Sequence, residues 1–287
     1  MDLKKSLRYA IEDFTLDTYN HLANKLTDKN FVFSPLSLHS ALTMVYFGAK
    51  DNTTTQKELQ QTLGGLAAED VVKDLYQKLV KDYNSRRSII YGNHLWVAEG
   101  FNLKEDYRNL ISRHMNANLS NADFNSDTAA QKVNDWIETF TKGKITDLVS
   151  DFSPETQMFL ANALYFKQSW KFAFDEKDLR GNKLKADFHF KDEGILPVDM
   201  MQLVSRFVEY EEFDLPNSRQ GFSVIKIPYE NKDLEMKIIL PKTKNRYLDL
   251  ALLETYLNLT INMDQVREKN ILRVVTTKVN YSVSRER

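Results

Sequence analysis

The feature that most constrains the fold is the run TQMFLANALYF (156–166), which is apolar from Met158 onward except for an amide, Asn162, near its centre. A nearly continuous apolar run predicts a central strand that is buried on both faces of a sheet. A buried amide without partners costs on the order of 1–3 kcal/mol, so Asn162 needs hydrogen bonds. It is either a core residue with local partners or part of a polar network where the sheet must open. Ser34 and Ser37 are the candidate partners in such a network.

Helical periodicity dominates the first half of the chain. Ser34 and Pro35 predict a helix start, with Ser34 as the N-cap and Pro35 in the first turn. The helix that follows, PLSLHSALTMVYFG (35–48), is apolar almost all round, which predicts that it is buried inside the domain. The spacing of Thr55 and Glu58 predicts a capping box at the start of a shorter helix. We therefore expect a helical layer in this half.

Strand patterns dominate the second half. RFVEYEEF (206–213), FSVIKIPY (222–229) and LEMKIILP (234–241) are short runs rich in β-branched and aromatic residues, and turn residues bound them. Asn231 to Asp233 predict a hairpin turn between the last two runs. Helices and strands interleave without a break in composition, so we expect one α+β domain over residues 1–287.

The charge balance and the absence of cysteine exclude several classes of function. Lys and Arg number 39, Asp and Glu number 40, and the net charge is −1, which gives no support for a nucleic-acid partner. Without cysteine, disulfides, thiol catalysis and cysteine-bound zinc are excluded. No apolar stretch of about eighteen residues occurs, so no membrane span is expected. The N-terminus lacks the apolar core of a signal peptide, which predicts a cytoplasmic protein, with the extracellular space as the alternative.

Sequence motifs of catalysis and of cofactor binding do not occur. There is no G-x-S-x-G nucleophile elbow, no H-E-x-x-H, and no P-loop or G-x-G-x-x-G. The five histidines are scattered, and none is paired with an acid at a diagnostic spacing. We therefore expect no enzyme activity, no catalytic residue, no cofactor and no metal site.

Four stretches, taken in order, carry the motifs by which the chain resembles the serpin family from about residue 3 to residue 275. FVFSPLSLHSALTMVYFGAKDNTTTQKELQQTLG resembles the family's second and third helices, and VNDWIETFTKGKITDLV resembles the helix that crosses the main sheet. FLANALYFKQSWKFAF is similar to the third strand of that sheet and the segment after it, and FSVIKIPYENKDLEMKIILP to a later strand pair. Gln168 and Ile227 stand where the family usually has Gly and Leu. The residues that match the family's motif core are Pro35, Trp136, Trp170, Phe174, Pro228, Tyr229 and Pro241.

The resemblance implies the α+β serpin fold, in which a helical N-terminal part packs on a large mixed β-sheet accompanied by smaller sheets. In that family Ser34, Ser37 and Asn162 match the shutter, a set of polar residues under the point where the main sheet parts. The implied activity is inhibition of serine, and sometimes cysteine, proteases without catalysis or cofactor. The protease cleaves a reactive loop, which then inserts into the main sheet as a new strand.

The C-terminal segment TTKVNYSVSRER (276–287) departs from the family pattern. No Glu-Glu-Gly hinge and no Ala/Thr-rich run occurs in the sequence, so no reactive bond is identified. We therefore expect a fold that is incomplete at the C-terminus and that does not trap a protease by loop insertion. Open sheet edges are then expected to favour self-association or aggregation. The alternative function is that of a non-inhibitory interaction protein, or an inactive isoform, on the same scaffold.

A basic helix raises the question of glycosaminoglycan binding, because the corresponding helix binds heparin in some serpins. Acidic residues interleave with the basic ones and dilute the positive field. We therefore favour a solvated mixed-charge face over a glycosaminoglycan site. The basic residues in question are Lys73, Lys78, Lys81, Arg86 and Arg87.

Overall fold

The computed structural model describes residues 3–26, 31–66, 69–85, 89–177, 181–189, 195–203, 209–214 and 221–241. The chain falls into two compact units. The first comprises residues 1–23 and 33–167, and the second comprises residues 24–32 and 168–287. The segment 276–287 lies outside the described residues, so its departure from the family pattern stays a prediction, as does a single domain over 1–287.

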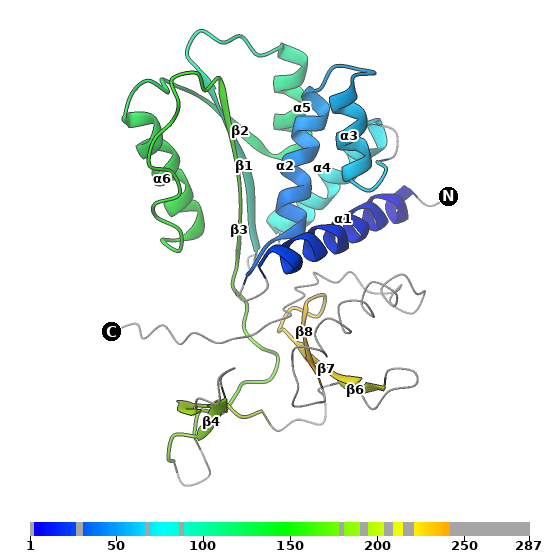
Figure 1. Ribbon diagram of the computed structural model, residues 1–287, viewed down its shortest axis with the longest axis vertical. Coiled ribbons are helices and arrows are strands. Elements are labelled where there is room, and N and C mark those ends of the chain that lie inside the picture. Colours follow the sequence, from blue (N-terminus) through cyan, green and yellow to red (C-terminus); the bar gives the residue numbers. More distant parts are fainter. Residues whose placement is uncertain are drawn as a thin grey trace. The chain divides into compact units, whose positions relative to one another are not determined.

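Helices make up much of the first unit (Figure 1). They are α1 (Leu3–Lys25), α2 (Pro35–Gly48), α3 (Thr54–Thr62), α4 (Glu69–Ser85), α5 (Glu105–Met115) and α6 (Thr128–Thr141). The predicted start of α2 is confirmed, because Ser34 Oγ accepts a hydrogen bond from the Ser37 N–H at 3.3 Å. The prediction that this helix is buried inside the domain holds for only part of it. The buried residues are Leu36, His39, Ser40, Thr43, Met44 and Tyr46. Leu38 and Val45 lie on a stripe that no described element covers, and they are 42% and 45% exposed.

The cap of α3 differs from the predicted one. Thr53 Oγ1 accepts a hydrogen bond from the Gln56 N–H at 3.3 Å, and Gln56 Oε1 accepts one from the Asn52 N–H at 2.9 Å. Thr53 is therefore the N-cap of α3, two residues before the predicted Thr55, and Gln56 accepts from the N–H of Asn52 rather than from that of the cap residue. The run of three threonines explains the error, because each offers the same hydroxyl and spacing alone does not choose among them.

Within the described residues, a mixed three-stranded sheet forms the other layer of the first unit. Its strands are β1 (Ile89–Ala98), β2 (Ala117–Ala122) and β3 (Met158–Phe166), in the order β2-β1-β3. β1 runs parallel to β2 and antiparallel to β3. On the outer strand β2, the side chains of Asn118 and Asn121 are exposed.

The central strand of this sheet is β1, which is buried from Tyr91 to Val97. The prediction that residues 156–166 form the central strand is therefore wrong for the described sheet, where β3 lies at the edge. Only Ala161 and Ala163 are buried in β3. A strand gains full burial from neighbours on both sides, and β3 has a described neighbour on one side only.

The two faces of the sheet have different covers, with α6 on one face and α2 on the other (Figure 1). Side chains alternate along a strand. Tyr91 and Asn93 therefore lie on the α2 face of β1, whereas Gly92 and Trp96 lie on the α6 face. A Cβ on Gly92 would lie 2.7 Å from ring atoms of Phe140. The glycine therefore lets the ring of Phe140 rest directly on the strand.

The second unit contains two small antiparallel sheets. β4 (Lys185–His189) pairs with β5 (Ile195–Asp199), and β6 (Glu209–Asp214), β7 (Gly221–Pro228) and β8 (Glu235–Pro241) follow one another in the order β6-β7-β8. These last three confirm the strands predicted from the sequence, although residues 206–208 lie outside the described part. The predicted turn is also confirmed, because the Leu234 N–H donates to Asn231 O at 3.0 Å.

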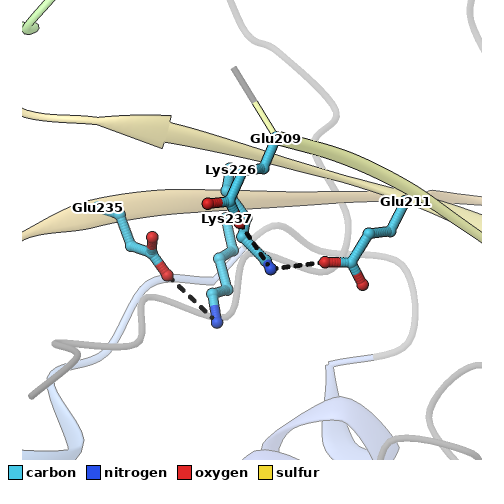
Figure 2. A network of polar contacts seen from close by, with 5 residues as sticks. All are labelled: Glu209, Glu211, Lys226, Glu235 and Lys237. Atoms are coloured by element: carbon cyan, nitrogen blue, oxygen red, sulfur yellow. Dashed lines mark hydrogen bonds and ion pairs between the residues drawn. The ribbon is translucent and has the colours of Figure 1, made fainter. Parts of the chain in front are cut away.

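Charged side chains form ion pairs between β6 and β7 and within β8 in the larger of these two sheets (Figure 2). Lys226 on β7 lies directly opposite Glu209 on β6 and Lys237 on β8. Its Nζ is 3.0 Å from Glu209 and 2.6 Å from Glu211, whereas Lys237 Nζ is 3.3 Å from Glu235. Opposed like charges destabilise a strand pair. Here each lysine has its own carboxylates, which offset that repulsion.

Candidate functional site

A chain of polar side chains connects α2 to the edge strand β3 through β1. We call Ser40, Tyr91, Asn93 and Asn162 the polar network. Asn162 Nδ2 donates to Asn93 Oδ1 at 2.6 Å, and Asn93 Nδ2 donates to Tyr91 Oη at 3.4 Å. The Tyr91 hydroxyl in turn donates to Ser40 Oγ. A continuous path of hydrogen bonds therefore runs from the helix layer to β3.

Strand register and burial explain why this network forms. Asn93 and Asn162 are direct partners in the β1–β3 pair, which places both amides on the α2 face. Asn93 is fully buried and also donates to Met115 O at 2.6 Å, so it satisfies a carbonyl at the C-terminal end of α5. Burial raises the pKa of Tyr91, against the opposing effect of its hydrogen bonds with Ser40 and Asn93. The phenol therefore stays neutral and can donate.

Of the predicted site residues, Ser34 and Ser37 bond each other through the helix cap, but neither bonds Asn162 as expected. Asn162 bonds Asn93 rather than the hydroxyls of Ser34 and Ser37. Ser34 caps α2, and Ser37 Oγ and Asn162 Oδ1 are buried atoms without a hydrogen-bond partner in the described part of the chain. The sequence signal for Asn93 was its polar side chain inside the apolar run IIYGNHLWVA (89–98). The role of the three predicted residues as a shutter stays a prediction.

The outer edge of β3 carries backbone groups that point away from β1. The Ala98 N–H donates to Gln157 O at 2.8 Å, so the backbone groups of Gln157 point toward β1. In an antiparallel pair every second residue does so, and the residues between them point their N–H and C=O away from the partner strand. In the described residues, β1 is the only strand that pairs with β3. By that alternation, the outward-facing N–H and C=O groups belong to Met158, Leu160, Asn162, Leu164 and Phe166. We call this row the open edge of β3.

Aromatic rings fill the space between β1 and α6. The ring of His94 stacks on Trp96 with centroids 3.8 Å apart, and Trp136 of α6 meets both rings edge-on at 5.3 and 5.5 Å. His94 Nε2 lies 2.9 Å from Ser120 Oγ, whereas its buried Nδ1 has no partner among the described residues. Burial lowers the pKa of His94 to about 4. This imidazole is therefore neutral near pH 7.

Several residues of the predicted motif core meet in the second unit. Trp170 stacks on Tyr229 with centroids 4.5 Å apart and meets Phe174 edge-on at 5.7 Å. The Lys171 N–H donates to Pro228 O at 3.0 Å. The segment after β3 is thereby joined to the end of β7. Of the other motif residues, Pro35 begins α2 and Pro241 ends β8.

The basic residues of α4 are partly neutralised. Lys73 Nζ lies 2.7 Å from Glu69 and 3.5 Å from Asp70, and it lies 5.9 Å from the ring centroid of Phe47. Lys78 and Lys81 are exposed. Arg86 and Arg87 lie outside the described residues, so a glycosaminoglycan site stays a prediction.

Across the described ranges, no three His, Cys, Asp or Glu side chains gather in a way that could hold a metal ion. None of the helices described here has the length and apolar character needed to cross a membrane.

Comparisons with known proteins agree on one family. The sequence profile described as Serpin (serine protease inhibitor) matches residues 9–281. An uncharacterised serpin-like protein of Thermococcus kodakarensis is 33% identical over 248 residues, covering 83% of this chain and 54% of that protein. Neuroserpin of Mus musculus is 31% identical over 256 residues, covering 86% of this chain and 60% of that protein. A solved structure of cleaved Serpin 42Da matches with a TM-score of 0.74 and 28% identity, over 90% of this chain and 66% of that one.

The α+β fold is that of the serpins, as predicted. The chain belongs to the serpin family. It spans 54% and 60% of the length of the two curated relatives named above. The family profile describes inhibitors of serine proteases, and it reaches residue 281, which lies beyond residue 275, where the predicted resemblance ends.

Proposed function

We propose that this chain provides the strand-accepting sheet of a serine-type endopeptidase inhibitor of the serpin kind. The open edge of β3 carries the proposal, because an added strand gains backbone hydrogen bonds along such an edge. Asn162 supports it further. Its backbone N–H and C=O face the open edge, while its side chain donates to Asn93 on β1. Asn162 therefore helps to hold β3 against β1 and leaves its own backbone groups available to an added strand.

The proposed partner is a serine protease, and the family also extends to cysteine proteases. In this proposal the protease supplies the catalytic chemistry, and the inhibitor supplies a substrate-like loop and the sheet that receives it. The chain itself then acts without catalysis and without a cofactor. The described residues supply the sheet, and the sequence contains no Glu-Glu-Gly hinge for the loop.

The test of strand acceptance uses synthetic peptides of about ten residues, to match the nine residues of β3. A peptide that adds to the open edge stabilises the folded chain, by about 2.7 kcal/mol at a hundredfold excess over its Kd. We expect Tm to rise by several degrees in a thermal melt. The control peptide has proline at alternate positions, which removes the N–H donors. Equal shifts with both peptides, or none with either, would overturn the proposal.

A second candidate is a non-inhibitory interaction protein, because the sequence contains no Glu-Glu-Gly hinge. Mixing the chain with trypsin-like, chymotrypsin-like and elastase-like proteases separates the two candidates. We expect that no denaturant-resistant covalent adduct forms with the 287-residue chain, although it accepts a peptide strand. An adduct on a denaturing gel would mean that the chain holds its own reactive bond.

A further inference from the structure

A buried histidine joins helices of the first unit, away from the open edge of β3. We call His39, Thr43, Tyr76, the Leu63 carbonyl and Phe14 the His39 cluster. His39 of α2 is 0% exposed. Its Nδ1 contacts the hydroxyl of Tyr76 on α4, and its Nε2 lies 3.2 Å from Leu63 O at the end of α3. The ring of Phe14 on α1 meets the imidazole edge-on at 5.2 Å.

The hydrogen bonds fix the protonation state of this imidazole. A carbonyl oxygen accepts only, so Nε2 carries the hydrogen and donates it to Leu63 O. Nδ1 is therefore the acceptor, and the Tyr76 hydroxyl donates to it. Thr43 Oγ1 adds a bond to His39 O at 2.8 Å. The neutral ring thus satisfies both of its nitrogens while it holds α2 against α3 and α4.

No charged group faces His39 from the described elements that pack around it. The facing groups are the Phe14 ring from α1, the Leu63 carbonyl from the end of α3, Tyr76 from α4, and Thr43 from α2 itself. Burial raises the pKa of Tyr76 well above its usual range, so that phenol carries no charge in acid or at neutral pH. An imidazolium here has no counterion, and burial lowers the pKa of His39 to about 4.

The His39 cluster lies next to the polar network along the chain. Ser40 follows His39 on α2 and accepts the hydrogen bond from Tyr91. From Tyr91 the network continues through Asn93 to Asn162 at the open edge of β3. If the contact between α2 and α4 at His39 is lost, α2 can shift, and Ser40 shifts with it. The first hydrogen bond of the polar network is then weakened.

We propose that His39 makes the support of the open edge sensitive to acid. Uptake of one proton at Nδ1 removes the acceptor for the Tyr76 hydroxyl, loosens α2 from α4, and weakens the polar network under β3. The link to strand acceptance rests on the proposed function, whereas the loosening of α2 does not. The pKa of His39 rises from about 4 in the folded chain to about 6.5 in the opened one. The opening equilibrium therefore grows about tenfold per pH unit as the pH falls from about 6.5 to about 4.

Amide hydrogen exchange of the full chain tests this directly. After correction for the intrinsic exchange rate, we expect the amides of α2 to open more at pH 5 than at pH 7. His39→Gln keeps an N–H for Leu63 O and does not titrate, so its α2 should lose most of this pH dependence. His94→Gln, on the opposite face of β1, is the matched control and should keep it. Equal pH dependence of α2 in the wild type and in His39→Gln would overturn the proposal.

A second measurement covers the case in which His39→Gln does not fold. The titration of the His39 ring in the wild-type chain is followed by NMR from pH 7 to pH 3.5. A midpoint near 4 supports the proposal, and a midpoint near 6.5 overturns it. Binding of the strand peptide is then measured at pH 7 and pH 5. If the peptide binds at neither pH, strand acceptance fails while the exchange result still decides the role of His39.

Discussion

The side-chain amide of Asn162 donates to the amide oxygen of Asn93 at 2.6 Å, across the antiparallel pair of β3 and β1. Asn93 is fully buried and also binds the last carbonyl of α5 through Met115. One amide of the central strand therefore holds both the edge strand and the end of a helix. The bond joins a half-buried amide to a fully buried one, and the low local dielectric around Asn93 makes it stronger than a bond on the surface.

Asn162→Ala tests the contribution of this bond to stability. The substitution leaves Asn93 Oδ1 buried without its donor, and we expect a loss of about 1–3 kcal/mol in the free energy of unfolding. Urea unfolding followed by circular dichroism measures it. Asn118→Ala on β2, where the side chain is exposed, is the matched control and should change stability by less than about 0.5 kcal/mol. Equal effects of the two substitutions would show that the cross-strand amide contributes nothing.

Gly92→Ala tests the contact between the sheet and α6. The new Cβ would lie 2.7 Å from the Phe140 ring, so α6 or the ring has to move. We expect a destabilisation of about 1–3 kcal/mol in urea unfolding, as for other overpacked cores. Phe140→Leu relieves the crowding, so the double variant should be more stable than the sum of the two single losses predicts. Strict additivity in this cycle would contradict the proposed clash.

Asn134→Ala tests how the segment between α6 and β3 is held. Asn134 Nδ2 donates to Val149 O at 2.8 Å, and its Oδ1 accepts from the Leu148 and Val149 N–H groups at 3.0 Å each. Each bond contributes about 0.5–1.5 kcal/mol. We therefore expect residues 143–157 to be cut several-fold faster by a dilute protease, as followed by mass spectrometry. Asn134→Asp keeps the acceptor and loses the donor, so its cleavage rate should be intermediate. Unchanged cleavage in both variants would rule out this clamp.

His94→Gln tests the effect of acid on the aromatic layer under α6. The pKa of His94 is lowered to about 4 by burial, so the unfolded state binds the proton first as the pH falls below about 6.5. The stability that the neutral ring contributes is present above pH 6.5 and is lost between there and pH 4. We expect the wild type to lose on the order of 1–2 kcal/mol at pH 5 through this residue.

Urea unfolding at pH 7 and pH 5 measures that loss. His94→Gln should reduce the difference between the two pH values, because glutamine does not titrate in this range. His21→Gln, at an exposed position of α1, should leave the difference unchanged. If His94→Gln and His21→Gln show the same difference in unfolding free energy between pH 7 and pH 5, protonation of His94 is not linked to folding.

The apolar run and its central amide could be found from the sequence, whereas the partner of that amide could not. Asn162 stands out because it interrupts TQMFLANALYF. Asn93 interrupts IIYGNHLWVA in the same way, but only the strand register places the two residues opposite each other. Register depends on contacts between segments far apart in the chain, and no local pattern encodes it. For the same reason the local sequence does not exclude Ser34 and Ser37 as partners of Asn162.

Local sequence patterns also do not predict whether a strand is central or lies at the edge of its sheet. Both β1 and β3 are apolar enough to be central, and β1 is central because β2 and β3 flank it. β2 itself, ANLSNA, was missed because an outer strand has little apolar periodicity to detect. The strands β6 to β8 and their turn were found because alternation and turn residues are local signals. Self-association through open edges and a cytoplasmic location stay predictions.

The polar outer strand of the main sheet has a practical consequence for following the molecule in solution. Asn121 on β2 is exposed, and it lies on the rim opposite β3. The chain has no native cysteine, so Asn121→Cys introduces a single thiol. A dye attached there labels every molecule at the same place, without removal of any other residue, and it leaves the far rim free for a reporter on an incoming peptide.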